Sequence, residues 1–470
     1  MADFDLILTG GTIVNADSMV RADLAVRDGL VAAIGHDLGT AREVVDVAGK
    51  LIMPGGIDSH VHLAQGSPFR EPHGPKVVMA DGFESGTRSA AFGGNTMVMP
   101  FCLQQHGQTM REALAAYHAL AEGNCYTDTS FHLIVTDPTP ALLGQELPAL
   151  VEEGYSSFKV FMTYEGMALA DRQILELLDV ARRHNALVMI HAENDDAIRF
   201  LTDKLEREGR VAPVYHGASR PIPVEREATH RAVSLAEIVD TKIMIVHVSN
   251  RPAMEEIERA QARGLTVLAE TCPQYLVLTE QDMARAGMEG AKYVCSPPPR
   301  DTASQEAMWE GIEQGIFSVF SSDHCPFRYA DVEGKLVPEG RDSFRHVPNG
   351  IPGIATRGPI LFSEGVSKGR IDPMRFVALT STNHSRIYGL YPRKGVLAPG
   401  ADADIAVWDP SQRRTIRHAD LFDGCDYSPY EGMEVTGWPV STLLRGQFVV
   451  RDGALVGQRG AGRYIARPMA

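Results

Sequence analysis

Side chains that can bind a metal ion stand at the ends of apolar, strand-like segments of this 470-residue chain. His60 and His62 are two residues apart, so on an extended chain their imidazoles share one face and can approach one metal ion. Later strand-like segments end in further ligand types, at His191, His247 and Asp323. Four histidines and one aspartate form a ligand set suited to zinc or a similar divalent ion.

Lys159 is unusual because it lies inside the apolar segment SSFKVFMTY, where an unpaired ammonium is costly to bury. Burial lowers the pKa of a lysine, and a neutral amine can add carbon dioxide to become a carbamate, an anionic ligand with two oxygens. Such a carbamate could bridge two metal ions. Taken alone, Lys159 could instead pair with a carboxylate, and a lone histidine at a strand end is more often structural. The joint placement of all six residues favours a metal centre.

The elements that must position these residues alternate between apolar strands and amphipathic helices over about residues 54–395, which is typical of a parallel α/β fold. We predict strands within 53–62, 95–101, 129–135, 156–162, 186–191, 242–248, 265–271 and 316–322, and helices within 110–123, 171–184 and 251–264. Eight such strands predict a (β/α)8 TIM barrel, whose active site lies at the C-terminal ends of the strands. The candidate ligands belong to the first, fourth, fifth, sixth and eighth strands.

Both ends of the chain are rich in short β segments separated by glycine-containing turns, such as DLILTGGTIV and STLLRGQFVVRDG. We therefore predict one small β-sandwich domain built from residues 1–53 and 396–470, with the barrel over residues 54–395. The loop 64–78 is long and rich in proline and glycine, which predicts a lid or substrate loop.

The composition argues against several classes of protein. A net charge of −15 without a basic run disfavours a nucleic-acid partner. The N-terminus lacks the basic region of a secretory signal, and no apolar run is long enough to span a bilayer, so we expect no membrane partner. Six scattered cysteines without a CxxC pair predict free thiols in a reducing cytoplasm.

Motifs along nearly the whole chain, several of them without any metal ligand, support this interpretation. They are GGIDSHVH, SSFKVFMTYEG, MIHAEN, IVHVSN, TCPQYL, CSPPPR, SSDHCPF, VPNGIPGI and DYSPYEGMEVTGWP. Together they resemble the dihydropyrimidinase and hydantoinase branch of the amidohydrolase superfamily, a group of cyclic amidohydrolases.

The resemblance implies two zinc ions bridged by N6-carboxylysine at Lys159. One metal would be held by His60, His62 and Asp323, and the other by His191 and His247. The resemblance also implies substrate contacts by Tyr164, Ser296 and Asn349, which the residues alone would not single out. As relatives of this branch are usually oligomeric, a homotetramer or homodimer is implied as well.

The implied reaction opens a dihydropyrimidine, a hydantoin or a related cyclic imide to the N-carbamoyl amino acid or half-amide. A hydroxide activated by two metals would attack the ring amide, Asp323 would transfer the proton, and Tyr164 with one metal would hold the oxyanion. The substrate would be a small cyclic amide.

Two alternative functions stay open. The chain could be another ring amidohydrolase, of the allantoinase or dihydroorotase type, although Leu63 and Ala64 stand where dihydroorotases carry an arginine that grips a substrate carboxylate. It could also be a non-catalytic oligomeric scaffold of the same family. The unusual loop 64–78, and Glu165 in place of a common lysine, leave the ring and its enantiomer open.

Overall fold

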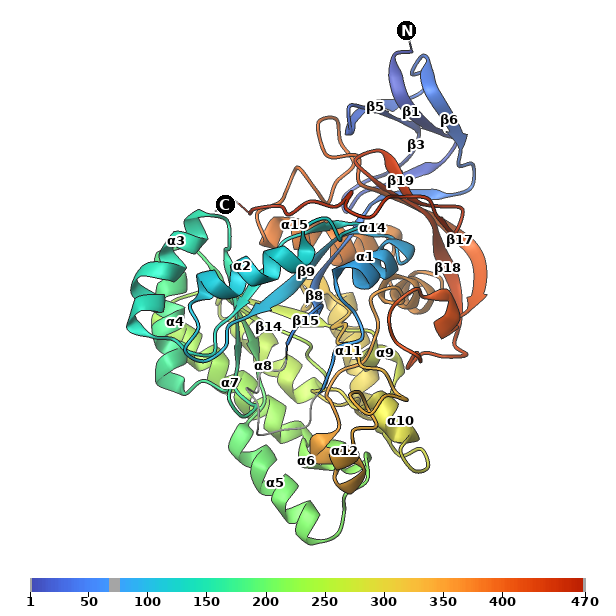
Figure 1. The fold of residues 1–470 in the computed structure, drawn as a ribbon. Helices are drawn as coiled ribbons and strands as arrows, with labels where there is room; N and C mark the ends of the chain where they lie inside the picture. The colour runs from blue at the N-terminus through green and yellow to red at the C-terminus, as the bar shows by residue number, and fades with distance from the viewer. Residues whose placement is uncertain (1, 67–76, 468–470) are drawn as a thin grey trace.

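A computed structural model describes residues 2–66 and 77–467, and within them eight parallel strands form a barrel at the centre of the molecule (Figure 1). In barrel order these are β8 (Gly56–Val61), β9 (Asn95–Leu103), β11 (His132–Ile134), β12 (Ser157–Phe161), β13 (Leu187–His191), β14 (Ile243–Ile245), β15 (Val267–Thr271) and β16 (Val319–Phe320). A short strand, β10 (Asp128–Thr129), also pairs with β9. Each barrel strand overlaps one predicted segment, so the predicted (β/α)8 TIM barrel is confirmed.

The barrel closes between the ends of its first and last strands through an isolated bridge and single hydrogen bonds. Val61 and His324 form an isolated parallel bridge, and the backbone N–H of His62 donates to the His324 carbonyl at 2.7 Å. The Asp58 carboxylate accepts a hydrogen bond from the backbone N–H of Ser322 at 3.1 Å. These contacts hold the segment that carries His60 and His62 beside the segment that carries Asp323.

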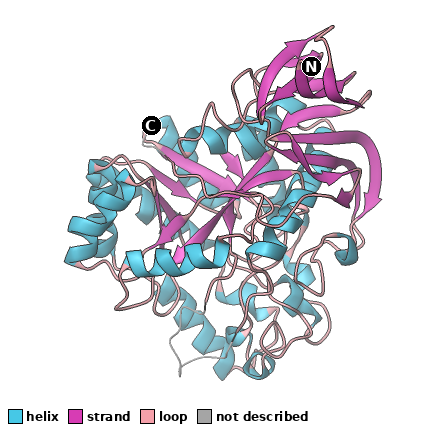
Figure 2. Cartoon of the chain, turned by 45° about the horizontal axis from the view of Figure 1, so that its top comes forward, coloured by secondary structure: helices cyan, strands magenta, loops and turns pink. Residues whose placement is uncertain are grey.

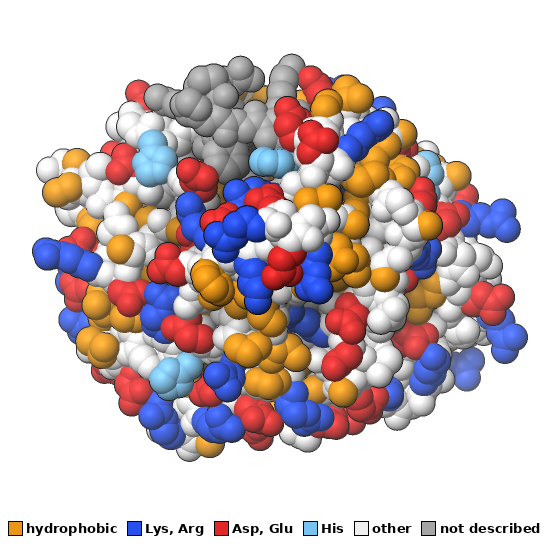
Figure 3. Space-filling model, turned by 90° about the horizontal axis from the view of Figure 1, so that it is seen from below, with side chains coloured by type: hydrophobic (Ala, Val, Ile, Leu, Met, Phe, Trp, Pro, Cys, Tyr) orange, Lys and Arg blue, Asp and Glu red, His pale blue; other side chains and the backbone are white. Residues whose placement is uncertain are grey.

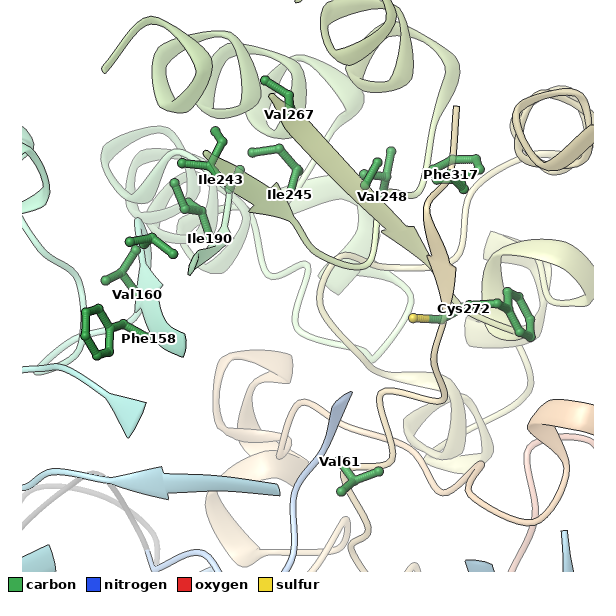
Figure 4. Close-up of a cluster of buried hydrophobic side chains, with 14 of the residues drawn as sticks. Val61, Phe158, Val160, Ile190, Ile243, Ile245, Val248, Val267, Cys272 and Phe317 are labelled. Atoms are coloured by element: carbon green, nitrogen blue, oxygen red, sulfur yellow. The ribbon is translucent and has the colours of Figure 1, made fainter. Parts of the chain in front are cut away.

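Strand alternation separates two buried layers. Phe158 and Val160 of β12 pack in the cluster between the barrel and its helices, and Figure 4 shows them with Ile190 and Ile243 of the neighbouring strands. Because side chains alternate along a strand, Lys159 points to the opposite face, into the barrel. Alternation along β12 thus turns Lys159, together with Ser157, toward the interior of the barrel.

Helices cover the outside of the barrel. The α-helices are α1 (Phe83–Phe92), α2 (Met110–Ala121), α3 (Leu147–Glu152), α4 (Asp171–Arg183), α5 (Asp195–Arg207), α6 (Tyr215–Ser219), α7 (Ile222–Val239), α8 (Arg251–Ala262), α9 (Gln274–Val277), α10 (Glu280–Met283), α11 (Thr302–Gln314), α12 (Pro338–Asp342), α13 (Arg357–Leu361), α14 (Pro373–Val377) and α15 (Asn383–Ile387). The three helices predicted at 110–123, 171–184 and 251–264 are confirmed. Helix α2 begins where it does because Thr109 and Glu112 form a reciprocal capping box.

Short 3-10 and π segments connect these helices. They are η1 (Leu142–Glu146), η2 (Glu289–Tyr293), η3 (Phe344–His346), η4 (Phe362–Val366), η5 (Ala378–Thr382) and η6 (His418–Asp420). Among the helices of the described ranges, none combines the length and the apolar character needed to cross a membrane.

Strands from both ends of the chain form a β-sandwich beside the barrel, drawn in magenta next to the N-terminus in Figure 2. Within the described residues, one sheet has the order β5 (Leu30–Gly35), β4 (Asp23–Arg27), β1 (Phe4–Thr9) and β6 (Ala41–Asp46). The other runs β20 (Ala454–Leu455), β19 (Gln447–Arg451), β18 (Glu434–Leu444), β17 (Ile405–Thr415), β7 (Leu51–Pro54), β2 (Thr12–Val14) and β3 (Met19–Arg21).

The antiparallel pairing of β17 with β7 joins the two ends of the chain. Between the sheets, Leu8 and Leu24 pack with Ile405 and Leu443 in one buried cluster. The predicted sandwich from both termini is confirmed, whereas the boundaries 1–53, 54–395 and 396–470 stay a prediction.

The last described residues return to the barrel. Tyr464 bridges to Thr129, and the backbone N–H of Ile465 donates to the Thr129 carbonyl at 2.7 Å. Arg467 is fully buried, with hydrogen bonds from its guanidinium to the hydroxyls of Ser130 at 2.9 Å and Ser157 at 2.7 Å. This arginine therefore ties the end of the described chain to the start of β12.

A buried ionic cluster joins β10 to the loop before β17. The Lys394 ammonium lies 2.8 Å from Asp128 and 3.1 Å from Asp402, and it also contacts Asp404. The three carboxylates lie close enough together to hold a metal ion, but Lys394, Arg445 beside Asp128 and Arg393 beside Asp402 already compensate their charge. Although burial lowers the pKa of Lys394, the carboxylates raise it above its usual value. We assign this cluster to stability rather than to metal binding.

Lys394→Met should lower the free energy of unfolding by roughly 3–5 kcal/mol, because removing one partner leaves buried charges uncompensated. Thermal unfolding would measure the loss. The matched control is Lys368→Met, which removes an exposed lysine paired with Glu364 and should cost at most about 1 kcal/mol. Equal melting temperatures for the two variants would contradict this assignment.

Candidate metal centre

All six predicted metal ligands line one cavity of about 600 Å³ at the C-terminal ends of the barrel strands. His60 belongs to β8, Lys159 to β12 and His191 ends β13. The other three lie just beyond strand ends, at His62, His247 and Asp323. The parallel barrel thus brings together residues that are up to 263 positions apart in the sequence, from position 60 to position 323.

The first group of donors consists of two histidines and the aspartate. The Oδ1 atom of Asp323 lies 3.2 Å from Nε2 of His60 and 3.6 Å from Nε2 of His62. The other ring nitrogens are engaged, since Nδ1 of His60 lies 2.6 Å from a Glu270 oxygen and Nδ1 of His62 lies 2.7 Å from the Gln65 amide oxygen. These partners hold each proton on Nδ1 and leave the Nε2 lone pairs for a metal ion.

The second group consists of His191 and His247, whose ring centroids are 4.4 Å apart. Nε2 of His191 lies 2.7 Å from Glu193, which also accepts a hydrogen bond from Arg220 at 2.8 Å, so Nδ1 of His191 is left for a ligand. Nδ1 of His247 is buried without a hydrogen-bond partner in the described part of the chain. The ring centroids of His60 and His247 lie 5.4 Å apart, so the two groups of donors are adjacent.

Lys159 stands between the two groups as a buried amine. Its side chain is fully buried, and its Nζ atom has no hydrogen-bond partner among residues 2–66 and 77–467. Nζ lies 5.3 Å from the ring centroid of Phe101 and 5.1 Å from that of Phe161. Burial lowers the pKa of Lys159 to about 8, against the charges of Glu270 and Asp323, which raise it. An amine in this state is available for carboxylation.

The histidines are held in the form that binds metals. Burial lowers the pKa values of His60, His191 and His247, and the nearby charge of Lys159 lowers them further. Neutral imidazole is the ligating form, so protons do not compete strongly at neutral pH. The donors fit a pair of divalent cations, because such ions would satisfy both the free Nε2 atoms and the unpartnered Nδ1 of His247.

Three residues of the site have left-handed backbone. Tyr164, His247 and Asp323 adopt φ angles of 79°, 42° and 49°, in a region that disfavours residues with a Cβ atom. Each such residue costs roughly 1–2 kcal/mol. Strain of this kind persists where the surroundings fix it, and it often marks functional sites.

The three predicted substrate contacts also meet in the cavity. Burial raises the pKa of Tyr164, while the guanidinium of Arg220 and the nearby side chains of Ser296 and Asn349 lower it in part. The Ser296 hydroxyl lies 3.3 Å from Nε2 of His216, and the Tyr164 ring lies 5.2 Å from that of His191. The structure therefore places Tyr164, Ser296 and Asn349 together on one wall, while their roles stay a prediction.

Some residues that support the site were missed in the sequence. Glu193 could have been found, since it lies two residues after His191 and shares its face. Glu270 could have been found too, because it is a carboxylate within the apolar segment LTVLAET. No local pattern points to Gln65 or Arg220, which meet their partners only through the fold.

The predicted lid falls largely on residues 67–76, which lie outside the described residues. On either side of them, Gln65 and Val77 line the cavity. Figure 3 views the molecule from the side where α5 and α12 lie in Figure 1, and there acidic and basic side chains are interspersed. At the cavity rim, Arg199 pairs with Asp195 at 2.6 Å, so these charges are already compensated.

Sequence and structure comparisons find known proteins that match this chain along nearly its whole length. A model of the "Amidohydrolase family" matches residues 51–449. A D-hydantoinase from Ralstonia pickettii is 42% identical, over 98% of this chain and 99% of that protein. A D-hydantoinase from Geobacillus stearothermophilus is 44% identical, over 98% and 96%. The crystal structure of a dihydropyrimidinase from Brevibacillus agri matches with a TM-score of 0.94 at 41% identity, over 98% of both chains.

His247→Ala should reduce the bound divalent metal from about two equivalents per chain to about one, because it removes a donor from the second group. Elemental analysis of zinc-loaded, dialysed protein measures this directly. His118→Ala is the control, since His118 bonds to Tyr155 outside the cavity and its removal should leave the metal content unchanged. An unaltered metal content in His247→Ala would remove this residue from the proposed ligand set.

Proposed function

The chain belongs to the amidohydrolase family, and we propose that it opens hydantoin and dihydropyrimidine rings at a two-zinc centre. It is a metal-dependent cyclic amidohydrolase, as the relatives of 42% and 44% identity indicate. The observation that carries the proposal is the convergence of four imidazoles and a carboxylate around the unpartnered amine of Lys159. The names of these relatives favour D-configured hydantoins as substrates.

Carboxylated Lys159 would bridge the two metals. The His60 and His62 imidazoles with Asp323 would hold one ion, and the imidazoles of His191 and His247 the other. A carbamate at Lys159 would replace a costly buried amine by an anion with two acceptor oxygens. When bound, two divalent cations lower the pKa of a water molecule and polarise the carbonyl of the ring amide.

Asp323 is the proposed proton carrier. Burial raises its pKa, but the contacts with His60 and His62, including a hydrogen bond with His62, lower it more, so the net shift is downward and the group is a carboxylate at neutral pH. It can accept the proton of the attacking water and deliver it to the ring nitrogen as the C–N bond breaks. The ring opens to a single product that carries a carboxylic acid at one end and an open-chain urea or amide at the other, which is the N-carbamoyl amino acid or half-amide.

Tyr164 supplies a hydrogen bond to the oxyanion. Because burial raises the pKa of its phenol, the hydroxyl keeps its proton and remains a donor through neutral pH. A donor placed in advance where negative charge develops stabilises the transition state. Ser296 and Asn349, on the same wall, would orient the ring amide through hydrogen bonds, largely by backbone groups.

The cavity favours an uncharged ring over a carboxylated one. Apolar side chains from separate segments line it, among them Val77, Leu103 and Met167. The buried guanidinium of Arg220 is already paired with Glu193. At the position where dihydroorotases carry an arginine, this chain has Ala64, which packs against the helix-facing core. A homotetramer or homodimer and a cytoplasmic location stay predictions.

Lys159→Ala should reduce kcat by roughly a thousandfold or more, because the bridge between the metals is lost. The fold should persist, since no described hydrogen bond depends on Nζ. Bicarbonate with a short carboxylic acid should restore part of the activity by replacing the bridging anion. Lys204→Ala on exposed α5 is the control and should match the wild type. A Lys159→Ala protein with both metals and full activity would refute the carbamate.

The zinc-loaded enzyme should open dihydrouracil and ring-substituted hydantoins with kcat/KM at least about a hundredfold above that for dihydroorotate, because the arginines among the described cavity residues are already paired with carboxylates. The D enantiomers of substituted hydantoins should react faster than the L enantiomers. A panel that adds allantoin and cyclic imides, followed by chromatography of the products, measures this. Hydrolysis of dihydroorotate alone would overturn the substrate class.

A further inference from the structure

Lys335 is a second buried lysine near the cavity, outside the proposed metal centre. It is fully buried and lies on the segment that leads into α12. The backbone N–H of Lys335 donates to the Arg328 carbonyl at 2.8 Å. Gly334 allows this close approach, because a Cβ atom there would lie 2.1 Å from the same carbonyl oxygen. The start of this segment is therefore fixed by its backbone.

The ε-amino group of Lys335 joins two separate loops. Nζ donates to the carbonyl of Val294 at 2.7 Å and to the carbonyl of Pro348 at 2.6 Å. Val294 stands two residues before Ser296, and Pro348 stands immediately before Asn349. One side chain thus holds the backbone of both loops that carry predicted substrate contacts.

The same loops are tied to the segment that follows Asp323. The backbone N–H of Gly350 donates to the Val294 carbonyl at 3.1 Å, so that carbonyl accepts two hydrogen bonds. The backbone N–H of Cys325 donates to the Ile351 carbonyl at 3.0 Å, and its thiol donates to the Asn349 carbonyl at 3.6 Å. Movement of either loop would therefore change its position relative to Asp323.

Charge pairing does not explain why a lysine occupies this place. In the described residues it forms no ion pair with a carboxylate, and the ionisable groups that act on it are the thiols of Cys295, Cys325 and Cys425. Burial lowers the pKa of Lys335 to about 7. Because even the neutral amine keeps two N–H donors, both carbonyls stay bonded in either protonation state. An apolar side chain could not replace these two hydrogen bonds.

We propose that Lys335 is a positioning residue for substrate recognition, which sets the distance between Ser296 and Asn349 by bridging the Val294 and Pro348 carbonyls. This inference rests on the proposed function, because Ser296 and Asn349 matter only if they contact the ring. Lys335 itself touches no reacting atom. It acts on binding through the backbone of the two loops.

Lys335→Met, which is one atom shorter than lysine and removes both donors, should raise KM for a ring-substituted hydantoin at least about tenfold while kcat changes by less than about threefold. Its zinc content should remain that of the wild type, because none of the proposed ligands contacts Lys335. The matched control is Val337→Ala, which removes buried packing from the same segment without touching either carbonyl. Its KM should stay within about twofold of the wild type.

The outcomes separate this inference from the proposed function. If the wild-type enzyme opens no cyclic amide, the proposed function fails; if it does, an unchanged KM in Lys335→Met overturns the positioning role alone. An equal rise of KM in Val337→Ala would show general loosening of the segment and would also overturn it. Should Lys335→Met not fold, Lys335→Gln, one atom shorter with donors retained, should raise KM at least about threefold. Loss of folding in both variants would assign Lys335 to stability.

Discussion

An amine inside a closed barrel needs either a partner or a change of chemical form. Lys159 of β12 is fully buried and points into the interior of the barrel. It finds no hydrogen-bond acceptor in the described chain. Burial favours the neutral amine, which is the form that can take up carbon dioxide and become an anion. Once that anion and two cations are present, the surrounding imidazoles and Asp323 act as metal ligands. The rest of the site is arranged around this single unsatisfied group.

The barrel supplies the precision that such a site needs. Parallel strands end at one rim, so ligands from five strands meet without long loops. Behind them, the carboxylates of Glu193 and Glu270 fix ring tautomers, and left-handed backbone at His247 and Asp323 aims the donors inward. These features cost stability locally, and the large barrel core compensates for them.

Sequence periodicity was sufficient to predict the strands, the sandwich and the six candidate ligands, because these depend on local alternation and on the rule that strand ends share a rim. His60 and His62 share a face for that reason. Contacts between distant loops leave no such pattern. The carbonyl partners of Lys335, the pairing of Arg220 with Glu193, and the place of Gln65 beside His62 depend on the tertiary fold. Tyr164, Ser296 and Asn349 were predicted only from the resemblance to a known family.

The order in which the chain is synthesised conflicts with the way its parts are joined. The sandwich needs β17, which begins at Ile405, to cover the apolar faces of strands that end by Pro54, and Arg467 reaches the barrel later still. About 350 residues separate β7 from β17, which corresponds to roughly 20–70 s on the ribosome at ordinary elongation rates. During that interval Leu8 and Leu24 have only the short N-terminal strands of the facing sheet, with Ile13 and Ile52, to pack against. Nascent chains of this protein are therefore expected to need protection by chaperones, and slow translation should favour aggregation over recovery.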